Sequence, residues 1–225
     1  MQLSIIIPTC NEAAHIVTTL TALQPLRARG VELVLVDGGS HDATLQHAAG
    51  LVDQAITTSP GRAVQMNAGA ALARGDALLF LHADTQLPID ADVWIANALA
   101  THAWGRFDVT IEGAHWMLPV IAWFMNHRSA LTGIATGDQA LFCSRDLFNR
   151  MGGFPQQPLM EDIGFCARAR YMQFPANIRQ VRVSTSGRRW EKHGVFRTIV
   201  LMWRLRLAYY VGADPHTLHA IYYGR

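Results

Sequence analysis

The chain has 225 residues, of which 50% are hydrophobic and 16% are charged. This composition excludes an intrinsically disordered protein, and the length fits one domain of ordinary size with a substantial core. Three widely spaced cysteines form no CxxC or Cys/His pattern, which excludes the common cysteine-based metal sites and favours buried thiols in a reducing compartment.

Three apolar runs in the first 85 residues are too short for helices and are predicted to be buried strands. These runs are Leu3–Ile7, Leu33–Val36 and Ala77–Leu81. Helical patterns lie between them, at Ala13–Leu23, Asp42–Ala49 and Ala63–Ala73. The alternation of strand and helix predicts a parallel sheet, which binds its ligands just beyond the carboxyl ends of its strands.

A polar group containing a carboxylate follows each predicted strand. The carboxylates are Glu12, Asp37 and Asp84, and we expect all three groups to meet in one crevice. The alternative is that these groups are ordinary caps of the turns that lead into helices. Asn11, which precedes Glu12, would suit a helix N-cap. Turn caps explain poorly why three carboxylates come to the same edge of one sheet.

The later part of the chain contains two further predicted elements. A polar turn at 136–139 precedes a short apolar strand, Ala140–Cys143, and a Gly- and Pro-rich loop leads to a helix over Ile163–Tyr171. Glu161 and Asp162 open this helix, where the helix dipole favours negative charge even without a catalytic role.

These groups resemble the ordered motifs of family 2 glycosyltransferases, enzymes of the GT-A fold that use nucleotide sugars. The motifs are Pro8-Thr9-Cys10-Asn11-Glu12, Val36-Asp37-Gly38-Gly39-Ser40, Leu81-His82-Ala83-Asp84, Thr136-Gly137-Asp138-Gln139, Gly152-Gly153-Phe154, Glu161-Asp162 and Gly187-Arg188-Arg189-Trp190. No single motif is decisive, but the ordered set is specific, and it covers roughly residues 3–190.

The resemblance implies an α/β fold with a GT-A-like, Rossmann-type, mostly parallel sheet flanked by helices, and a basic helical C-terminal extension. It implies one glycosyltransferase domain over 1–225, with a nucleotide-sugar-binding half at 1–100, an acceptor and catalytic half at 101–190, and the extension at 191–225. The implied reaction transfers a sugar, with inversion, from a UDP- or GDP-sugar to the hydroxyl of an unidentified acceptor.

On this resemblance, residues at the strand ends and on the helix at 63–73 bind the nucleotide. They are Pro8, Thr9, Asn11, Glu12, Asp37, Arg62, Asn67, His82 and Ala83. Arg62 also follows Gly61 at the start of a helix, which predicts an anion site in its own right, with an ordinary surface arginine as the alternative. The family's usual second Asp after Asp37 is Gly38 here, so one polar contact to the donor is missing.

Asp84 is the implied ligand of a divalent cation, Mn²⁺ or Mg²⁺. Both ions prefer oxygen ligands and take one or two carboxylates together with substrate phosphates. The family has a D-x-D motif at this point, and His82 replaces its first Asp. His82 would line the ribose or join the metal shell, where a histidine somewhat favours manganese.

The resemblance makes Asp162 the general base and Glu161 the residue that orients the acceptor. An inverting transfer needs one carboxylate to take the acceptor's proton as its oxygen attacks the anomeric carbon. The acceptor and the diphosphate are assigned to Gly137, Asp138, Gln139, Arg189 and Trp190. A simple turn before a strand, and a core tryptophan, are the alternatives for this set.

The net charge of +2 conceals an uneven distribution along the chain. Residues 1–162 contain 8 Lys+Arg and 15 Asp+Glu, a net −7, and residues 163–225 contain 11 and 2, a net +9. A helix predicted at Val195–Ala213 combines aromatic and basic residues, which suits either a membrane interface or packing on the sheet. We expect a cytoplasmic protein without a signal peptide or nucleic-acid partner, in peripheral contact with the inner membrane face or in a homodimer.

Two other functions fit part of the pattern. A sugar nucleotidyltransferase shares a related α/β architecture, but Pro8–Glu12 lacks its Gly-rich phosphate loop. A non-catalytic nucleotide-sugar- or carbohydrate-binding protein on a degenerate GT-A scaffold would account for His82 and Gly38. It would not account for the presence of both Asp84 and Asp162.

Overall fold

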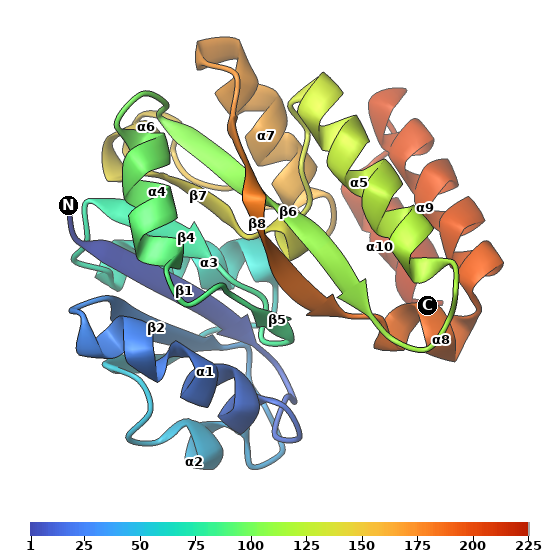
Figure 1. The fold of residues 1–225 in the computed structure, drawn as a ribbon. Coiled ribbons are helices and arrows are strands. Elements are labelled where there is room, and N and C mark those ends of the chain that lie inside the picture. The colour runs from blue at the N-terminus through green and yellow to red at the C-terminus, as the bar shows by residue number, and fades with distance from the viewer. Residues whose placement is uncertain (225) are drawn as a thin grey trace.

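The computed structural model describes residues 1–224, which form one mixed sheet with helices on both faces (Figure 1). The strands lie in the order β3-β2-β1-β4-β7-β6-β8-β5. Their bounds are β1 Leu3–Thr9, β2 Glu32–Asp37, β3 Gln54–Thr57, β4 Ala77–Phe80, β5 Thr85–Gln86, β6 Trp104–Glu112, β7 Leu141–Ser144 and β8 Ala176–Ser186. The helices are α1 Ile16–Ala28, α2 Thr44–Ala48, α3 Arg62–Leu72, α4 Ala91–Leu99, α5 Leu118–Thr132, the 3₁₀ helix η1 Gly137–Gln139, α6 Arg145–Arg150, α7 Glu161–Met172, α8 Arg188–His193, α9 Val195–Tyr210 and α10 Pro215–Tyr223.

The predicted parallel sheet is confirmed in the N-terminal half. β1 pairs in parallel with β2 and β4, and β2 pairs in parallel with β3. β1, β2 and β4 are buried along their whole length, as their continuous apolar runs indicate. The carboxyl ends of these strands therefore lie along one edge of the sheet.

The first predicted helix is displaced in the structure. α1 begins at Ile16 instead of Ala13, because residues 13–15 form a turn in which the backbone N–H groups of His15 and Ile16 both donate to the carbonyl oxygen of Glu12. It continues to Ala28, because Leu26 extends the buried stripe while Pro25 lies on the exposed side. The helix predicted at Ile163–Tyr171 is present as α7, and Glu161 and Asp162 open it as expected.

The strand predicted at Ala140–Cys143 is present in the C-terminal half of the sheet as β7, whereas β6 and β8 are strands that the sequence did not predict. β7 is antiparallel to both β4 and β6, whereas β6 and β8 are parallel. β6 carries Arg106 and Asp108 among its buried residues, and two charges in the middle of a strand hide its apolar pattern.

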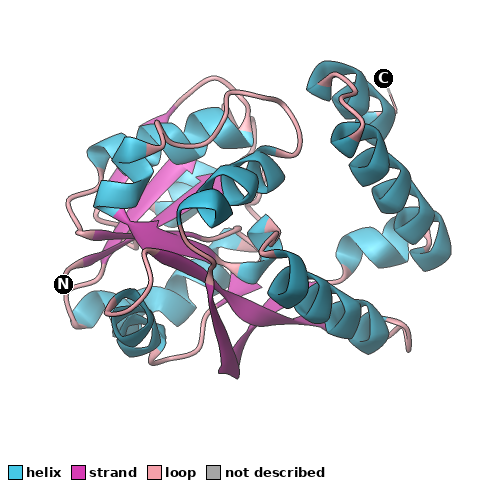
Figure 2. Ribbon diagram, turned by 90° about the horizontal axis from the view of Figure 1, so that it is seen from above, coloured by secondary structure: helices cyan, strands magenta, loops and turns pink. Residues whose placement is uncertain are grey.

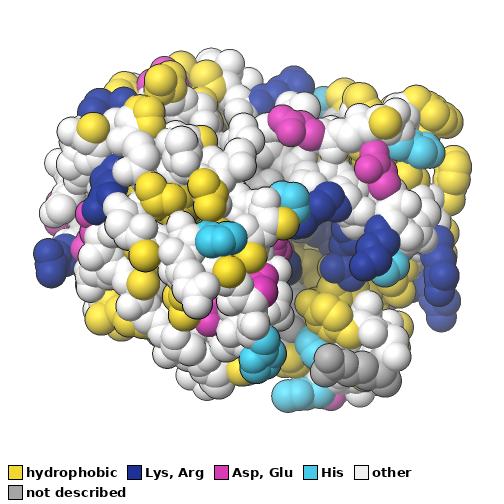
Figure 3. All heavy atoms as spheres, turned by 90° about the horizontal axis from the view of Figure 1, so that it is seen from below, with side chains coloured by type: hydrophobic (Ala, Val, Ile, Leu, Met, Phe, Trp, Pro, Cys, Tyr) yellow, Lys and Arg dark blue, Asp and Glu magenta, His cyan; other side chains and the backbone are white. Residues whose placement is uncertain are grey.

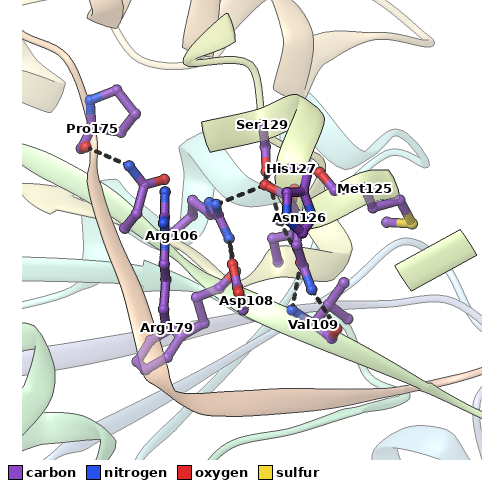
Figure 4. Close-up of polar contacts among 12 residues, drawn as sticks. Arg106, Asp108, Val109, Met125, Asn126, His127, Ser129, Pro175 and Arg179 are labelled. Atoms are coloured by element: carbon purple, nitrogen blue, oxygen red, sulfur yellow. Dashed lines mark hydrogen bonds and ion pairs between the residues drawn. The ribbon is translucent and has the colours of Figure 1, made fainter. Parts of the chain in front are cut away.

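The buried charges of β6 belong to a polar network that attaches α5 to the sheet (Figure 4). Arg106 forms an ion pair with Asp108 and donates through Nη2 to the carbonyl oxygen of Asn126, at 3.1 Å. The Asn126 side chain accepts from the N–H of Val109 and donates to its carbonyl oxygen, each at 2.9 Å. Because Gln139 donates to Ser129 of the same helix at 3.0 Å, the network also fixes η1.

The two faces of the sheet have separate hydrophobic cores. One core holds Ile5 and Ile7 of β1 together with α1 and α4, and the other holds Ile6 with α3, α6 and α7. Helices α8, α9 and α10 lie to one side of the sheet, as the view from above shows (Figure 2). α9 contacts α5 through Val195 and Ile199, and Leu205 enters the second core.

The basic C-terminal helix therefore packs on its own chain along part of its surface. Within residues 1–224, no helix has both the length and the apolar character that crossing a bilayer requires. Cys143 and Cys166 are buried, and burial raises the pKa of both thiols. The expectation of buried thiols is wrong for Cys10, which lies exposed in the loop after β1.

Candidate active site

A wide cleft separates the carboxyl edge of the sheet from the C-terminal helices. Its walls come from the end of β1, the start of α3, the β4–β5 connection, η1, the start of α7, and helices α5, α8, α9 and α10. Seen from below, the hollow lies between acidic and histidine side chains on one side and a group of basic side chains on the other (Figure 3). Its volume of about 2230 Å³ exceeds the roughly 300–1,000 Å³ of an ordinary ligand pocket, so it has room for two substrates.

Most of the residues selected from the sequence line this cleft. They are Pro8, Thr9, Glu12, Arg62, His82, Ala83, Asp84, Gly137, Asp138, Glu161, Asp162, Arg189 and Trp190. Four others, Asn11, Asp37, Asn67 and Gln139, are not among the residues that line it.

Asp37 and Asn11 are engaged in the turn that follows β2. The carboxylate of Asp37 is buried and accepts from the backbone N–H groups of Gly39 and Ser40, at 2.9 and 2.8 Å. Asn11 has a φ of 56° and accepts from the N–H of His41 at 2.9 Å. The N-cap alternative for Asn11 is wrong, because α1 begins five residues later.

Asn67 and Gln139 use their side-chain amides to hold neighbouring segments of the chain. Asn67 donates to the carbonyl oxygen of Phe154 and accepts from its N–H, at 3.0 and 2.9 Å. Gln139 is fully buried and bonds to α5. Both residues therefore position the walls of the cleft from outside it.

At the sheet end of the cleft, Arg188 joins two of the strand-end carboxylates. Its Nη2 lies 3.2 Å from Oδ2 of Asp84 and 3.3 Å from Oε2 of Glu12. The two acids therefore share one positive charge, contributed by α8 across the cleft. The sequence motif at 187–190 includes Arg188, but only Arg189 and Trp190 were selected from it.

His82 lies against the 3₁₀ helix η1. Its Nδ1 is 3.1 Å from Oδ1 of Asp138, and a Cβ added to Gly137 would come within 2.3 Å of its Nε2. Only glycine leaves room for the imidazole at this point. Burial would raise the pKa of Asp138, but the hydrogen bond and charge of His82, with the positive charge of Arg62, outweigh burial and lower it.

Glu161 and Asp162 begin α7 after a residue in the left-handed region, Met160, which is buried with a φ of 64°. Such a backbone costs of order 1 kcal/mol and is retained where the surrounding structure holds it. Asp162 accepts from the N–H of Gly137 through Oδ2 at 3.0 Å and from its neighbour Ile163 through Oδ1 at 2.7 Å. Both oxygens are thereby fixed at the wall of the cleft.

Burial raises the pKa of both carboxyl groups at the start of α7. Burial and then the charge of Asp162 raise the pKa of Glu161 to about 7, against the opposing charge of Arg62. The pKa of Asp162 is also raised, mainly by burial, although its two backbone hydrogen bonds counteract this. A carboxyl group with a raised pKa is suited to exchanging a proton near neutral pH.

We expect the free energy of unfolding to fall as the pH rises from about 4.5 to about 7. Over this range the folded protein keeps the proton on Glu161, whose pKa is about 7, while the unfolded chain loses it near the ordinary value of 4.5. Glu161→Gln removes the titration and should be more stable than the wild type above pH 7, by up to about 3 kcal/mol.

Urea unfolding of both proteins at pH 5 and pH 8 measures this effect. Asp146→Asn, at an exposed carboxylate outside the cleft, is the matched control and should keep the wild-type pH dependence. Parallel pH profiles for the wild type and Glu161→Gln would show that Glu161 does not hold its proton in the folded state.

The cleft also contains arginines that the sequence did not indicate as site residues. Arg128 of α5 and Arg206 of α9 line the cleft beyond Asp162. Within residues 1–224, Nε and Nη2 of Arg128 are buried without a hydrogen-bond partner, an arrangement that costs free energy unless a ligand or water supplies acceptors. No motif in the sequence marks Arg128, which looks like any polar residue of a helix.

The predicted site residue Arg189 is held by α10, because its guanidinium lies 3.7 Å from the ring centre of Tyr222.

Comparison with known proteins identifies relatives of this architecture. Residues 4–148 match the model of glycosyl transferase family 2. A PGL/p-HBAD biosynthesis glycosyltransferase of Mycobacterium bovis is 44% identical over an alignment of 91 residues that covers 37% of this chain and 36% of that protein. The aligned region thus spans little more than a third of this curated relative.

Solved structures share the fold at low sequence identity. Residues 1–349 of Staphylococcus aureus TarS superpose with a TM-score of 0.64 at 18% identity, covering 83% of this chain and 61% of that one. The mannosyltransferase PcManGT of Pyrobaculum calidifontis, in complex with GDP-Man and Mn²⁺, gives 0.64 at 23% identity, covering 92% and 60%. Glucosyl-3-phosphoglycerate synthase of Mycobacterium tuberculosis, in complex with Mn²⁺ and UDP, gives 0.58 at 20% identity, covering 82% and 70%. With the family match over more than half of its length, the chain belongs to glycosyl transferase family 2.

Proposed function

We propose that the chain is an inverting glycosyltransferase that moves a sugar from a nucleotide diphosphate sugar to an acceptor hydroxyl, with the aid of a divalent cation. The observation that carries this proposal is that Asp84, at the sheet end, and Asp162, at the start of α7, line the same cleft. Relatives of the same fold bind UDP, UDP-GlcNAc or GDP-Man, which supports a UDP- or GDP-sugar as the donor.

The donor would lie between the sheet edge and α3. Pro8, Thr9, His82 and Ala83 line the wall there, and Arg62 at the start of α3 is placed to meet the diphosphate. Asp37, Asn11 and Asn67 would shape this wall through the backbone contacts described above.

The residues present fit a divalent cation that the donor itself helps to hold. Within residues 1–224, no cluster of three or more His, Cys, Asp or Glu side chains forms a closed metal cage. Mg²⁺ and Mn²⁺ need only one or two carboxylates when phosphates supply further oxygens. Asp84 would supply one, and Glu12, which contacts the same Nη2 of Arg188, would be the candidate for the second. A cation bound there would neutralise the leaving diphosphate.

Asp162 would take the proton of the acceptor hydroxyl as its oxygen forms a bond to the anomeric carbon and the bond to the diphosphate breaks. Its raised pKa suits this transfer. Glu161 would orient the acceptor, as would Gly137, Asp138, Arg189 and Trp190, while Gln139 would hold η1 in place from α5.

Thermal unfolding in the presence of nucleotide diphosphates tests the donor site. A ligand at 100 times its Kd stabilises the folded state by about 2.7 kcal/mol, which corresponds to a rise in Tm of roughly 5–10 °C for a chain of this size. We expect UDP or GDP to give this rise with Mn²⁺ and a smaller one with EDTA, and the matching nucleoside to give little. Absence of any shift across the nucleotide panel would contradict the proposal.

The cytoplasmic location, the peripheral membrane contact, the homodimer and the extent of the domain over 1–225 stay predictions from the sequence. Co-sedimentation with anionic vesicles at low salt tests the membrane contact, and sedimentation velocity tests the dimer. Attraction of the basic segment to such vesicles should weaken as salt is added.

A further inference from the structure

The outer part of the cleft is apolar, unlike the donor end. Several of its lining residues are large hydrophobic side chains that folding leaves exposed; among them, Phe196 is 63% exposed, Trp203 72% and Leu207 67%. An apolar surface of this kind is costly in water and marks a binding site when it is continuous. It lies on α9, and α5 forms the facing wall.

The helical period explains how α9 presents this surface. Phe196, Val200, Trp203 and Leu207 recur at intervals of four, three and four residues, so they form one stripe along the helix. Val195, Thr198 and Leu205 occupy other positions and are buried against the body of the protein. α9 therefore buries one of its apolar faces and leaves a second one open along the cleft.

α5 supplies the opposite side of the groove. Val120 and Phe124 line the cleft four residues apart, and Phe124 is 60% exposed. Val195, at the start of α9, belongs to the same hydrophobic cluster as Ile121 of α5. The apolar groove is thus lined on both sides by helix faces, which share a hydrophobic cluster near the start of α9.

The groove continues toward the proposed base. Arg128 and Arg206 line the cleft together with Asp162. The buried Nε and Nη2 of Arg128, which have no partner among residues 1–224, are donors placed for oxygen atoms of a ligand. A molecule lying here would meet polar donors at one end and an apolar surface along its length.

We propose that the groove between α5 and α9 binds the acceptor, and that the acceptor is an amphiphile. Its hydroxyl-bearing head lies at Asp162 and Arg128, and its alkyl or aryl body lies along Phe124, Trp203 and Leu207. This inference rests on the proposed function, because it names the acceptor class of the same site.

A second copy of the chain fits the groove less well. The segment 188–206 contains six Lys or Arg residues and a single acid, Glu191. Two copies packed through this segment would bring like charges together, which opposes association. An amphiphile with a neutral or anionic head brings no such repulsion.

Binding of alkyl β-D-glucosides, measured by calorimetry below their micelle concentrations, tests the proposal. Each methylene group buried in the groove should tighten binding by roughly fourfold, so affinity should rise steadily from butyl to hexyl to octyl glucoside. A flat series for the wild type would overturn the proposal, as would binding seen only to vesicles or micelles.

Two variants distinguish binding of the ligand's polar head from binding of its apolar body. Trp203→Ser should reduce the gain in affinity per methylene group, whereas Arg128→Gln should weaken the binding of all members of the series by a similar factor. Tyr171→Ser is the matched control, because Tyr171 is an 83% exposed aromatic residue outside the cleft; it should bind the series as the wild type does. An equal loss in Tyr171→Ser and Trp203→Ser would overturn the proposal.

The rise in Tm that UDP or GDP causes in the presence of Mn²⁺, the nucleotide shift, is measured on the same preparations. It keeps this test distinct from that of the proposed function. A preserved nucleotide shift in Trp203→Ser shows that the variant is folded and that its donor site is intact. A nucleotide shift with a flat glucoside series refutes the amphiphilic acceptor alone, whereas loss of the nucleotide shift in the wild type refutes the donor site. If sedimentation velocity shows a dimer that octyl glucoside cannot dissociate and that binds no glucoside, the groove is a subunit interface and the proposal is wrong.

Discussion

Asp162→Asn is expected to lower kcat by on the order of 100-fold or more while leaving donor affinity close to that of the wild type. A positioned general base contributes about this factor, and an amide cannot take the acceptor's proton. The side-chain amide of this variant would still present one oxygen to the N–H of Gly137 or Ile163, the two groups that hold the carboxylate now. The fold and the donor end of the cleft should therefore be preserved.

Steady-state kinetics combined with nucleotide calorimetry checks this expectation. Glu161→Gln, one residue earlier in the same turn, is the control. It should lose less turnover, because the proposed role of Glu161 is to orient the acceptor and not to receive its proton. If Asp162→Asn turns over at near the wild-type rate, another group must be the base. Loss of nucleotide affinity in this variant would instead indicate damage to the site as a whole.

Asp84→Ala is expected to remove the metal-dependent part of nucleotide affinity. Loss of groups that merely support a metal ligand costs 10–100-fold in affinity, so loss of a direct ligand should cost on the order of 100-fold or more. The core should be little affected, because Asp84 lies beyond the end of β4 with 28% of its side chain exposed. Arg188 would keep its contact with Glu12.

Calorimetric titration of the nucleotide that gives the largest thermal shift, with Mn²⁺ and with EDTA, measures this loss. Asp146→Ala is the control, because it removes an exposed carboxylate that does not line the cleft. Wild-type affinity of Asp84→Ala in Mn²⁺ would refute the assignment of Asp84. Equal affinity of the wild type in Mn²⁺ and in EDTA would refute the cation itself.

The first half of the sheet could be predicted because β1, β2 and β4 are buried on both faces, and such strands read as unbroken apolar runs. β6 and β8 could not be predicted. The burial of Arg106 depends on Asp108 and on the carbonyl oxygen of Asn126, a partner 20 residues away. A charged residue in a strand signals burial only when its partners are known.

The candidate site likewise contains residues that could be predicted from the sequence and residues that could not. Parallel topology is enough to place the ends of β1 and β4 on one edge, and Glu12 and Asp84 lie there. The side-chain roles of Asn67 and Gln139 depend on distant contacts, such as that between Asn67 and Phe154, 87 residues apart. Arg188 reaches Asp84 across 104 residues, so only the folded chain reveals that pair.

The Arg188 bridge bears on the kinetic order of the reaction. Arg188 ties α8 to Glu12 and Asp84, and α8 leads directly into α9, the helix that lines the apolar groove. If Asp84 holds the cation and diphosphate as proposed, its carboxylate would exchange the guanidinium of Arg188 for them, and the segment that carries the opposite wall would be freed. The first substrate to bind would then set the shape of the site for the second, which is the behaviour of an ordered sequential mechanism with the donor leading.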